Sequence, residues 1–285
     1  MKTVVPVDIE RARNVAVTAA EAAGVLLRES AAKNLRVRTK DASGDVVTEL
    51  DLAAERLIVK HIRDAFPRHQ IIAEESGLLS TDDSAFTWLV DPLDGTNNVV
   101  IGLNVFVVGI ALCADKVPVL GVVHDPVTDH TWSAIRGGGT RGPLSTTSYE
   151  QHRSAPRGLV LAWTQGHKVG PADKTARAIR MVLESNARRV LQLWAPLLSW
   201  VMLARGDIDG FVGYRPEGID LPAGSLISQE AGITVRDLDG SVFDDRIDTP
   251  EQARSFVAGR PEVIGNLLEL VHDARNGSPS PDITG

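Results

Sequence analysis

The stretch that most constrains this chain is Trp88-Leu-Val-Asp-Pro-Leu-Asp-Gly-Thr-Asn97, where an apolar run ends in two aspartates, Asp91 and Asp94. An apolar run of this kind predicts a buried strand. Ligands of open α/β sheets bind outside the carboxyl ends of strands, so both carboxylates are expected at the edge of a crevice. The alternative interpretation is a pair of ordinary loop turns, Asp-Pro and Asp-Gly, and the segment alone does not decide between them.

The closeness of the two acids suggests a chemical role. Two neighbouring carboxylates repel each other unless a cation joins them. Mg²⁺ is typically held by one or two carboxylates together with the phosphate oxygens of a substrate. The first hypothesis is therefore a metal-dependent phosphate site.

The composition excludes several classes of protein. The chain has 285 residues, of which 43% are hydrophobic and 24% charged, which is ordinary for a folded globular protein. Its formal net charge of −7 argues against a nucleic-acid or membrane-surface binder, because those proteins neutralise phosphate with basic side chains. If the substrate carries phosphate, a metal ion has to supply the positive charge.

The cysteine count and the N-terminal residues both bear on the cellular compartment. Cys113 is the single cysteine, so no disulfide can form within the chain. The first thirteen residues carry acids and arginines where a signal peptide needs an apolar core, and the longest apolar stretch, Val99 to Ala114, is too short to span a membrane. We expect a cytoplasmic protein without a membrane partner.

The pattern of helices and strands changes near residue 150. Apolar residues at helical spacing predict helices at Asp8 to Ala32 and at Thr48 to Phe66. The first half continues with short strands, the last three of which are expected as an antiparallel meander: 70–73, 87–91, 105–113, 117–124 and 131–135. The second half alternates strands and helices: strands at 159–163, 189–193, 208–212, 234–237 and 255–258, with helices at 171–185, 195–204, 220–231 and 260–274. This predicts a layered α/β fold with an N-terminal half at 1–150, a C-terminal half at 151–275 and a disordered tail at 276–285.

Further acids stand at the boundaries of predicted elements. Glu74 and Glu75 follow a strand, Asp51 opens the second helix and Asp220 opens a late one. Each also has a structural interpretation, because acids are common in charged loops and at helix starts. For Asp51 it is strong, because Thr48-Glu-Leu-Asp51 has the spacing of a capping box.

Rival chemistries have no comparable set of residues. The seven histidines show no zinc-binding spacing, and Cys113 has no partner cysteine. The chain has no Gly-x-Ser-x-Gly, so a serine hydrolase lacks support, and the glycine-rich connection from Gly137 to Ser148 has no lysine and therefore does not make a nucleotide P-loop.

Four segments carry a resemblance to a known family. They are Asp45-Val-Val-Thr-Glu-Leu-Asp51, Ile72-Ala-Glu-Glu-Ser-Gly77, Trp88-Leu-Val-Asp-Pro-Leu-Asp-Gly-Thr-Asn97 and Asp220-Leu-Pro-Ala-Gly-Ser-Leu-Ile-Ser-Gln-Glu-Ala-Gly232. In order and approximate spacing the chain resembles the inositol monophosphatase family of Mg²⁺-dependent, lithium-sensitive phosphatases. The resemblance implies an α/β/α/β/α sandwich, usually dimeric, and a small phosphorylated substrate.

The resemblance also implies roles for individual residues. Glu74, Asp91 and the Leu93 carbonyl would hold one Mg²⁺, and Asp91 would be shared with a second ion held by Asp94 and Asp220. A weaker third ion would depend on Glu74, which therefore counts as catalytic. Asp51 and Thr96 resemble the pair that orients and deprotonates the attacking water, and the Gly95 and Thr96 amides would bind the phosphate.

The substrate side departs from the family pattern. Gly213 stands where an inositol-binding glutamate is expected, so inositol specificity does not follow. Trp194 lies at the start of the substrate-side helix and either stacks on a ring or fills the core; we expect the core, because buried aromatics mostly pack. Candidate selectivity residues are Tyr214, Arg215 and Glu217, with a solvated loop as the alternative.

The leading hypothesis is a Mg²⁺-dependent phosphomonoesterase acting on a small polyol, sugar or related phosphate. Alternatives on the same fold are a nucleotide 3′-phosphatase and a histidinol-phosphate phosphatase. An alternative of another class is a binding or regulatory protein that keeps the fold without catalysis.

Overall fold

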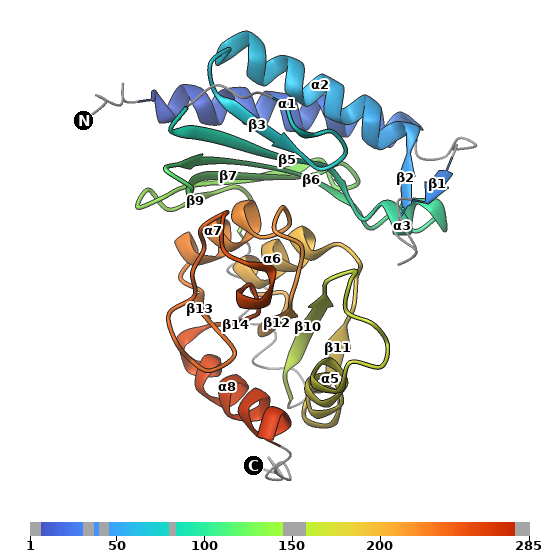
Figure 1. Ribbon diagram of the computed structural model, residues 1–285, viewed down its shortest axis with the longest axis vertical. Coiled ribbons are helices and arrows are strands. Elements are labelled where there is room, and N and C mark those ends of the chain that lie inside the picture. The colour runs from blue at the N-terminus through green and yellow to red at the C-terminus, as the bar shows by residue number, and fades with distance from the viewer. Residues whose placement is uncertain (1–6, 31–36, 40–45, 80–83, 145–157, 277–285) are drawn as a thin grey trace.

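The computed structural model describes residues 7–30, 37–39, 46–79, 84–144 and 158–276 (Figure 1). Among these residues the strands form a seven-stranded sheet, a five-stranded sheet and a two-stranded pair. We call the seven-stranded sheet the first sheet and the five-stranded sheet the second sheet. The pair consists of β1 (Val37–Thr39) and β2 (Val46–Thr48), which run antiparallel and were not expected from the sequence.

The first sheet is mostly antiparallel and is built in the order β4-β3-β5-β6-β7-β8-β9. Among the described strands of this sheet, only β3 and β5 pair in parallel, and β6, β7 and β8 form the expected meander. The bounds of its strands are β3 Gln70–Ala73, β4 Gly77–Leu78, β5 Phe86–Asp94, β6 Val107–Ala114, β7 Val117–Asp125, β8 His130–Ile135 and β9 Thr140–Arg141.

The second sheet has the order β11-β10-β12-β14-β13. Its first three strands are parallel, and β14 runs antiparallel to both of its neighbours. The bounds of its strands are β10 Val160–Gln165, β11 Arg189–Leu191, β12 Gly210–Tyr214, β13 Thr234–Arg236 and β14 Phe256–Gly259.

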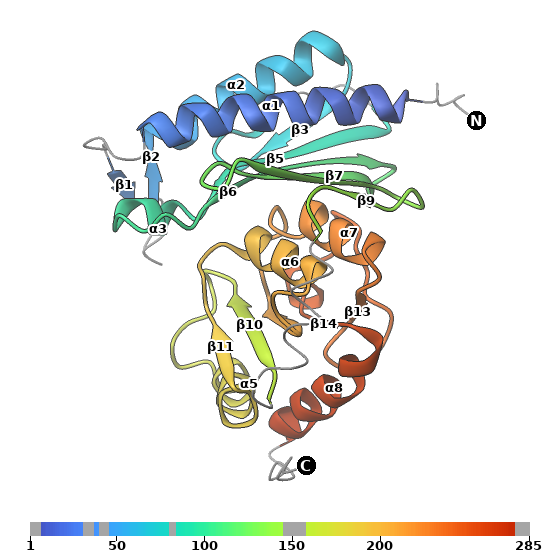
Figure 2. The same ribbon diagram turned by 180° about the vertical axis from the view of Figure 1, so that it is seen from behind.

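The helices divide the molecule into layers. The long helices α1 and α2 cover one face of the first sheet, α6 and α7 lie between the two sheets, and α5 and α8 cover the outer face of the second sheet (Figures 1 and 2). This order confirms the predicted α/β/α/β/α sandwich. The helix bounds are α1 Ile9–Ser30, α2 Glu49–Ala65, α3 Thr96–Val100, α5 Lys174–Asn186, α6 Pro196–Arg205, α7 Pro222–Glu230 and α8 Pro261–Asn276, with a 3₁₀ turn at Glu251–Ala253.

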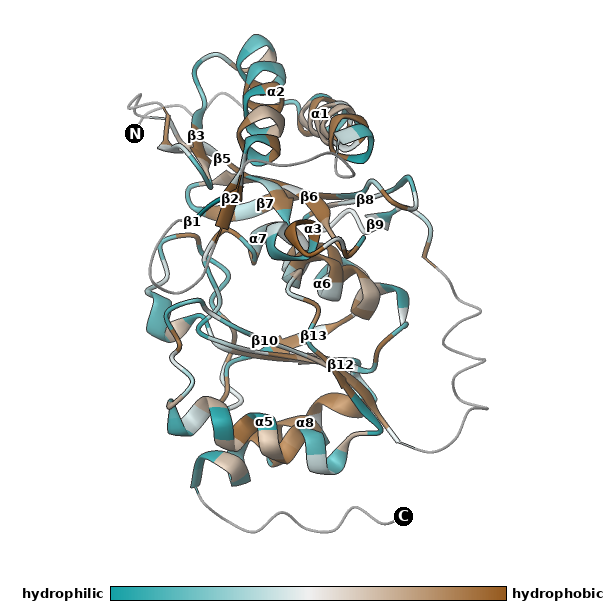
Figure 3. Ribbon diagram, turned by 90° about the vertical axis from the view of Figure 1, so that its right-hand side faces the viewer, coloured by the Kyte–Doolittle hydropathy of each residue, from teal (hydrophilic) through white to brown (hydrophobic). Residues whose placement is uncertain are grey.

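Burial on both faces of the first sheet explains its continuous apolar runs. In β5, Trp88 and Val90 pack toward α1 and α2, whereas Leu89 packs toward α6 and α7. Successive strand residues point to opposite faces, so a strand covered on both sides needs apolar residues at every position. Figure 3 shows apolar strands and the apolar sides of helices turned toward the spaces between the layers.

Strand β5 and helix α8 both end later than the sequence predicted. The predicted strand 87–91 runs on through Asp94, but its pairing with β6 is irregular between Asp91 and Asp94. Pro92, which lacks a backbone N–H, lies in that irregular stretch. Asn276, which was predicted to open a disordered tail, belongs to α8, and the rest of the predicted tail, 277–285, lies outside the described residues.

The proposed division into halves stays a prediction, because its junction, 145–157, is also outside the described residues. In the part of the chain that the structure describes, no helix is both long enough and apolar enough to cross a membrane.

Candidate active site

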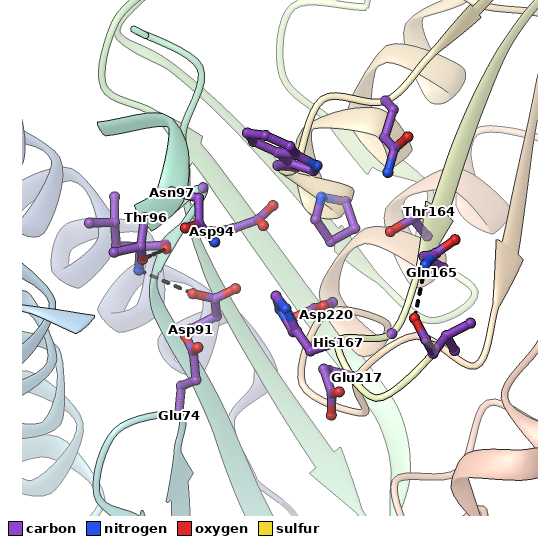
Figure 4. A pocket seen from close by; sticks show the side chains of 17 residues that line it. Glu74, Asp91, Asp94, Thr96, Asn97, Thr164, Gln165, His167, Glu217 and Asp220 are labelled. Carbon is purple, nitrogen blue, oxygen red and sulfur yellow. Dashed lines mark hydrogen bonds between the residues drawn. The ribbon is translucent and has the colours of Figure 1, made fainter. Parts of the chain in front are cut away.

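Four of the acids predicted from the sequence, Glu74, Asp91, Asp94 and Asp220, line one cavity between the first sheet and the second half of the chain (Figure 4). The cavity has a volume of about 380 Å³, within the range of small-molecule sites. Its lining residues are Glu74, Asp91, Leu93, Asp94, Gly95, Thr96, Asn97, Thr164, Gln165, Gly166, His167, Val169, Gln192, Trp194, Pro196, Glu217 and Asp220. The predicted metal ligands from three separate segments therefore share one cavity.

The end of β5 positions the two aspartates of the opening motif. The Leu93 amide donates a hydrogen bond to Asp91 Oδ1 over 3.1 Å, which closes a short turn around Pro92. Asp91 is only 2% exposed and Asp94 only 6%. The turn interpretation and the site interpretation are therefore compatible, because the turn aims both carboxylates into the cavity.

Asp94 is also attached to the second half of the chain. Its Oδ2 accepts a hydrogen bond of 2.7 Å from the Leu197 amide, in the first turn of α6. A helix N-terminus carries free amides and a partial positive charge, both of which favour a carboxylate. Gly109, which pairs with Asp91 across the sheet, gives the Leu197 side chain room, because a Cβ there would overlap Leu197 Cδ1.

Asp51 and Thr96 form a buried hydrogen-bonded pair. The Thr96 hydroxyl lies 2.6 Å from Asp51 Oδ1 and 3.0 Å from the Leu93 carbonyl oxygen. Asp51 Oδ2 accepts a hydrogen bond of 2.8 Å from the Thr48 amide and a second from the Thr48 hydroxyl. The expected capping box of α2 is thus present, and the same carboxylate reaches Thr96 with its other oxygen.

Gly95 makes the sharp turn from β5 into α3. Its φ of 109° is in the left-handed region, which favours glycine. A Cβ at this position would stand 2.6 Å from the Val105 carbonyl oxygen. No other residue fits here without displacing the backbone, so the Gly95 and Thr96 amides have a fixed place on the cavity wall.

Glu74 is held by a support that the sequence did not reveal. Its amide donates to the Val90 carbonyl over 3.0 Å, which extends the pairing of β3 with β5. Behind it, the buried Glu55 of α2 accepts a hydrogen bond of 2.8 Å from the Glu75 amide and another from the Ser76 hydroxyl. Glu55 lies one helical turn after Asp51 on the buried face of α2, and an acid on an apolar helix face was the available signal.

Burial and mutual repulsion act on the charge of the aspartates. Burial, reinforced by the negative charges of Glu74, Asp94 and Asp220, raises the pKa of Asp91 well above its usual value. Burial also raises the pKa of Asp94, although the hydrogen bond from the Leu197 amide opposes this in part. A carboxylate in this position is most stable as an anion when a cation lies beside it.

The donor chemistry of this set fits Mg²⁺, which prefers carboxylate and carbonyl oxygens. Among the described residues, no three aspartate, glutamate, histidine or cysteine side chains lie close enough together to hold a metal ion by themselves. Glu74, Asp91, Asp94 and Asp220 nevertheless line the same cavity, and Mg²⁺ usually keeps several waters rather than a complete cage of protein ligands.

Trp194 corrects one expectation. The predicted core position is wrong, because the side chain is 56% exposed and lines the cavity. Its φ of 53° turns the chain sharply just before α6. Asn98 fixes this segment, because its side-chain Nδ2 donates hydrogen bonds to the Leu193 carbonyl at 2.6 Å and to the Val105 carbonyl at 2.7 Å.

The other selectivity candidates differ in position. Glu217 lines the cavity, whereas Tyr214 and Arg215 do not. Tyr214 is buried in the core between the second sheet and its outer helices, with the Arg215 guanidinium 5.4 Å above its ring. Their selectivity role stays a prediction that the cavity does not support.

The sequence did not single out the cavity residues at or just after the ends of β10 and β11. They are Thr164, Gln165, His167 and Gln192. The Gln165 side-chain Nε2 donates a hydrogen bond of 3.1 Å to the Val169 carbonyl, which folds this loop back on itself. These residues lie at or just after the ends of parallel strands of the second sheet, and the rule that ligands collect at the carboxyl ends of strands was the available signal.

Comparisons with known proteins agree with this geometry. The sequence model of the inositol monophosphatase family matches residues 8–276. The chain is 33% identical over 259 residues to the Nus factor SuhB of Pasteurella multocida, covering 90% of this chain and 94% of the relative. It is also 33% identical over 244 residues to inositol monophosphatase 1 of Solanum lycopersicum, covering 83% and 88%.

A solved structure supports the same conclusion. The Thermotoga maritima IMPase TM1415 superposes with a TM-score of 0.77 at 26% identity and covers 93% of this chain and 98% of its own. Since the family model spans nearly all of the described residues, the chain belongs to the inositol monophosphatase family.

Proposed function

We propose that this protein is a Mg²⁺-dependent phosphomonoesterase that hydrolyses a small phosphate ester. One observation carries the proposal: Glu74, Asp91, Asp94 and Asp220 line one cavity together with Thr96, whose hydroxyl donates a hydrogen bond to the buried Asp51. Family membership supports the phosphatase class, since the family is Mg²⁺-dependent in general. The relatives' names do not specify the substrate of this chain.

The ligand assignment follows the family resemblance, and the shared cavity lining supports it. Glu74, Asp91 and the Leu93 carbonyl would hold one ion, and Asp91, Asp94 and Asp220 a second, with a weaker third ion near Glu74. When bound, Mg²⁺ would offset the charge of the carboxylates and the phosphate and would make a nearby water more acidic. The remaining steps depend on side chains and amides of this chain.

Asp51 and Thr96 would prepare the attacking water. When the Thr96 hydroxyl donates its single proton to Asp51, its lone pairs remain available to accept a proton from a water. Asp51 is fully buried and held on its other oxygen by Thr48, so it keeps the hydroxyl in this orientation. The oriented water loses a proton to the Thr96 and Asp51 pair as it attacks phosphorus, and the ester P–O bond breaks. The leaving alkoxide takes a proton from solvent, and the pair returns its proton to solvent.

The Gly95 and Thr96 amides would meet the phosphate oxygens. Phosphoryl transfer needs mainly positioning and charge stabilisation, and amides fixed by the turn at Gly95 supply both without moving. A homodimer, a cytoplasmic location and inhibition by lithium complete the proposal.

The direct test is release of phosphate. Protein stripped with a chelator should be inactive on a panel of polyol, sugar, nucleotide and amino-alcohol phosphates, and added Mg²⁺ should restore turnover. No release from any ester would refute the phosphatase proposal, and turnover would exclude a binding protein without catalysis.

Two variants test the roles of the residues. Asp94→Asn and Thr96→Ala should each lower kcat/KM by about 100-fold or more while remaining folded by circular dichroism. Asp64→Asn, which removes an exposed carboxylate on α2, is the matched control and should keep wild-type activity. Wild-type activity in either of the first two variants contradicts the assigned role.

A further inference from the structure

The cavity has an uneven charge distribution that bears on the substrate. Among its described lining residues are five carboxylates and no lysine or arginine, and His167 is the one side chain that can become cationic. Four of these acids are the proposed metal ligands, whose charge two divalent ions would balance. Glu217 is the fifth and has no part in the metal sites proposed above, so the following inference rests on the proposed function.

Glu217 lies on the wall opposite the end of β5. It belongs to the segment between β12 and α7, and its Oε1 is 3.7 Å from the point where a Cβ on Gly166 would stand. The Gly166 amide donates a hydrogen bond of 3.1 Å to the Tyr214 carbonyl, which joins the loop after β10 to the end of β12. Figure 4 shows Glu217 and His167 on the same side of the cavity, with Asp91 and Asp94 across from them.

The Glu217 carboxylate is weakly compensated. In the part of the chain that the structure describes, it makes no hydrogen bond and no ion pair, and its electrostatic partner is Lys168. The Lys168 ammonium is itself bound to Glu251 at 3.2 Å, and its side chain is 67% exposed. An exposed ammonium shared between two acids screens each of them little.

A negative wall with no basic side chain among its described lining residues discriminates between leaving groups. A second phosphate or a carboxylate on the substrate would meet Glu217, and the weakly screening Lys168 would offset little of the repulsion. A neutral polyol would gain only ordinary hydrogen bonds. A protonated amine or guanidine would gain a charge-assisted hydrogen bond, which is about twice as strong as a neutral one.

We infer that Glu217 selects phosphate monoesters whose alcohol carries a positively charged nitrogen, such as an amino alcohol, an aminated sugar or an aminated cyclitol. The phosphate lies at the metal-binding side of the cavity, and the cationic nitrogen lies against Glu217. The chain thereby differs in substrate class from an enzyme for neutral polyol phosphates.

The test compares esters of matched shape. Initial rates with Mg²⁺ are measured for 2-aminoethyl phosphate against 2-hydroxyethyl phosphate and for glucosamine 6-phosphate against glucose 6-phosphate. The wild type should prefer the cationic member of each pair by about tenfold or more in kcat/KM. Fructose 1,6-bisphosphate and adenosine 3′,5′-bisphosphate should be poorer substrates than either cationic ester.

Variants then assign the preference to one carboxylate. In Glu217→Gln the cationic-to-neutral ratio should fall to about one, because the charge is lost and the size is kept. Glu184→Gln removes the same charge from the exposed outer face of α5 and should keep the wild-type ratio. Circular dichroism checks folding, and Glu217→Ala is a second variant with the same expected loss.

The outcomes separate the inference from the proposed function. Equal rates on both members of each pair, faster turnover of a bisphosphate, or a preference that survives in both Glu217 variants would overturn the inference and leave the phosphatase proposal standing. Failure of the wild type to release phosphate from every ester would overturn the proposed function and the inference with it.

Discussion

The most informative single residue is Asp51, because its two oxygens belong to two different networks. Oδ2 closes the capping box with Thr48, and Oδ1 receives the Thr96 hydroxyl. Neither network leaves the carboxylate free to rotate. A buried carboxylate with both oxygens engaged keeps Thr96 in one orientation, which is what activation of a water requires.

Replacing Thr96 by serine and by valine tests this relay. Thr96→Ser keeps the hydroxyl and should retain kcat within about tenfold, whereas Thr96→Val keeps the shape and should lose about 100-fold or more. The measurement is steady-state phosphate release at saturating Mg²⁺. Equal activity in the two variants would show that the hydroxyl takes no part in turnover.

The buried aspartates predict a pH dependence of stability. Because the pKa of Asp91 and of Asp94 is raised in the folded state, the metal-free native protein holds protons that the unfolded chain has released. The two aspartates therefore lower the free energy of unfolding as the pH rises. This decrease runs from about pH 4, the ordinary pKa of a carboxyl group, up through the raised pKa of the folded state. Mg²⁺ competes with those protons and should stabilise the protein more at higher pH.

The measurement is the shift in Tm caused by Mg²⁺ at pH 5.5 and at pH 8. The shift should be larger at pH 8, where saturating metal adds about 2 to 3 kcal/mol at a hundred times its Kd. Asp94→Asn, which lacks one of the two titrating acids, should show a smaller difference between the two pH values. A shift that is the same at both pH values would contradict the metal assignment.

At the scale of residues, the sequence predicted which side chains belong to the candidate site better than it predicted their contacts. Asp51, Glu74, Asp91, Asp94 and Asp220 were all placed at element boundaries, and the structure brings the last four together on one cavity. The Leu197 amide on Asp94 and the exposure of Trp194 were not predictable, because both depend on how α6 meets the first sheet. Contacts between segments far apart in the chain leave no local pattern in the sequence.

At the scale of elements, small residues decide how closely helices approach the first sheet. The buried face of α1 consists largely of alanines, with Gly24 against β7. A Cβ on Gly24 would overlap the imidazole of His124, which is buried and whose Nδ1 lies 2.9 Å from the Thr131 hydroxyl. This ring cannot move aside without losing that contact.

Alanine at Gly24 should therefore destabilise the protein although it favours helix formation. Overpacking in Gly24→Ala is expected to lower the free energy of unfolding by about 1 to 3 kcal/mol, and the higher helix propensity of alanine offsets about 1 kcal/mol of this loss. Gly265→Ala in α8 is the matched control, because a Cβ there meets nothing within 4 Å. It should stabilise by about 0.5 to 1 kcal/mol. Urea unfolding measures both, and a stable Gly24→Ala would show that His124 can shift.

The elements themselves were largely predictable. The helices around α1, α2, α5 and α8 and the meander of β6, β7 and β8 match the apolar periodicity to within a few residues. The antiparallel pair β1 and β2 was missed, because three-residue strands with exposed or polar positions resemble a loop. Short strands held by pairing rather than by burial have no periodic signal.

At the scale of the whole molecule, the site depends on the close packing of α6 and α7 against the first sheet. Gly109 makes room for Leu197, and Gly121 of β7 lies against the backbone of Ala223 in α7. Asp220 precedes α7 by two residues, so the distance of that helix from the sheet sets the distance of Asp220 from Asp91. Two glycines in the sheet thus bring the proposed ligands of the two halves together.

Gly121→Ala should weaken metal binding as well as stability. Its Cβ would stand 2.6 Å from the Ala223 carbonyl oxygen, so α7 has to move away from the sheet. We expect a loss of about 1 to 3 kcal/mol in stability and a weaker Mg²⁺ affinity measured by calorimetry. Gly24→Ala, on the opposite face of the sheet, should lose stability and keep the affinity. Unchanged Mg²⁺ affinity in folded Gly121→Ala would rule out this coupling.

The fold class was within reach of the sequence, but the packing of the layers was not. Alternating strands and helices implied a layered molecule, and the resemblance supplied the order of the layers. The close approach of α7 to β7 depends on the missing side chain of Gly121, and the periodicity of the sequence does not reveal such a contact.

Asp51 has a consequence for how variation at this protein will be read. A mutational survey scored by protein abundance would rank Asp51 with helix caps, whose loss costs about 1 kcal/mol. The same survey scored by turnover would rank it with the reacting groups. Inherited or engineered changes at this position will therefore look like folding defects in one assay and like chemical defects in another. Activity per folded molecule is the quantity that tells the two apart.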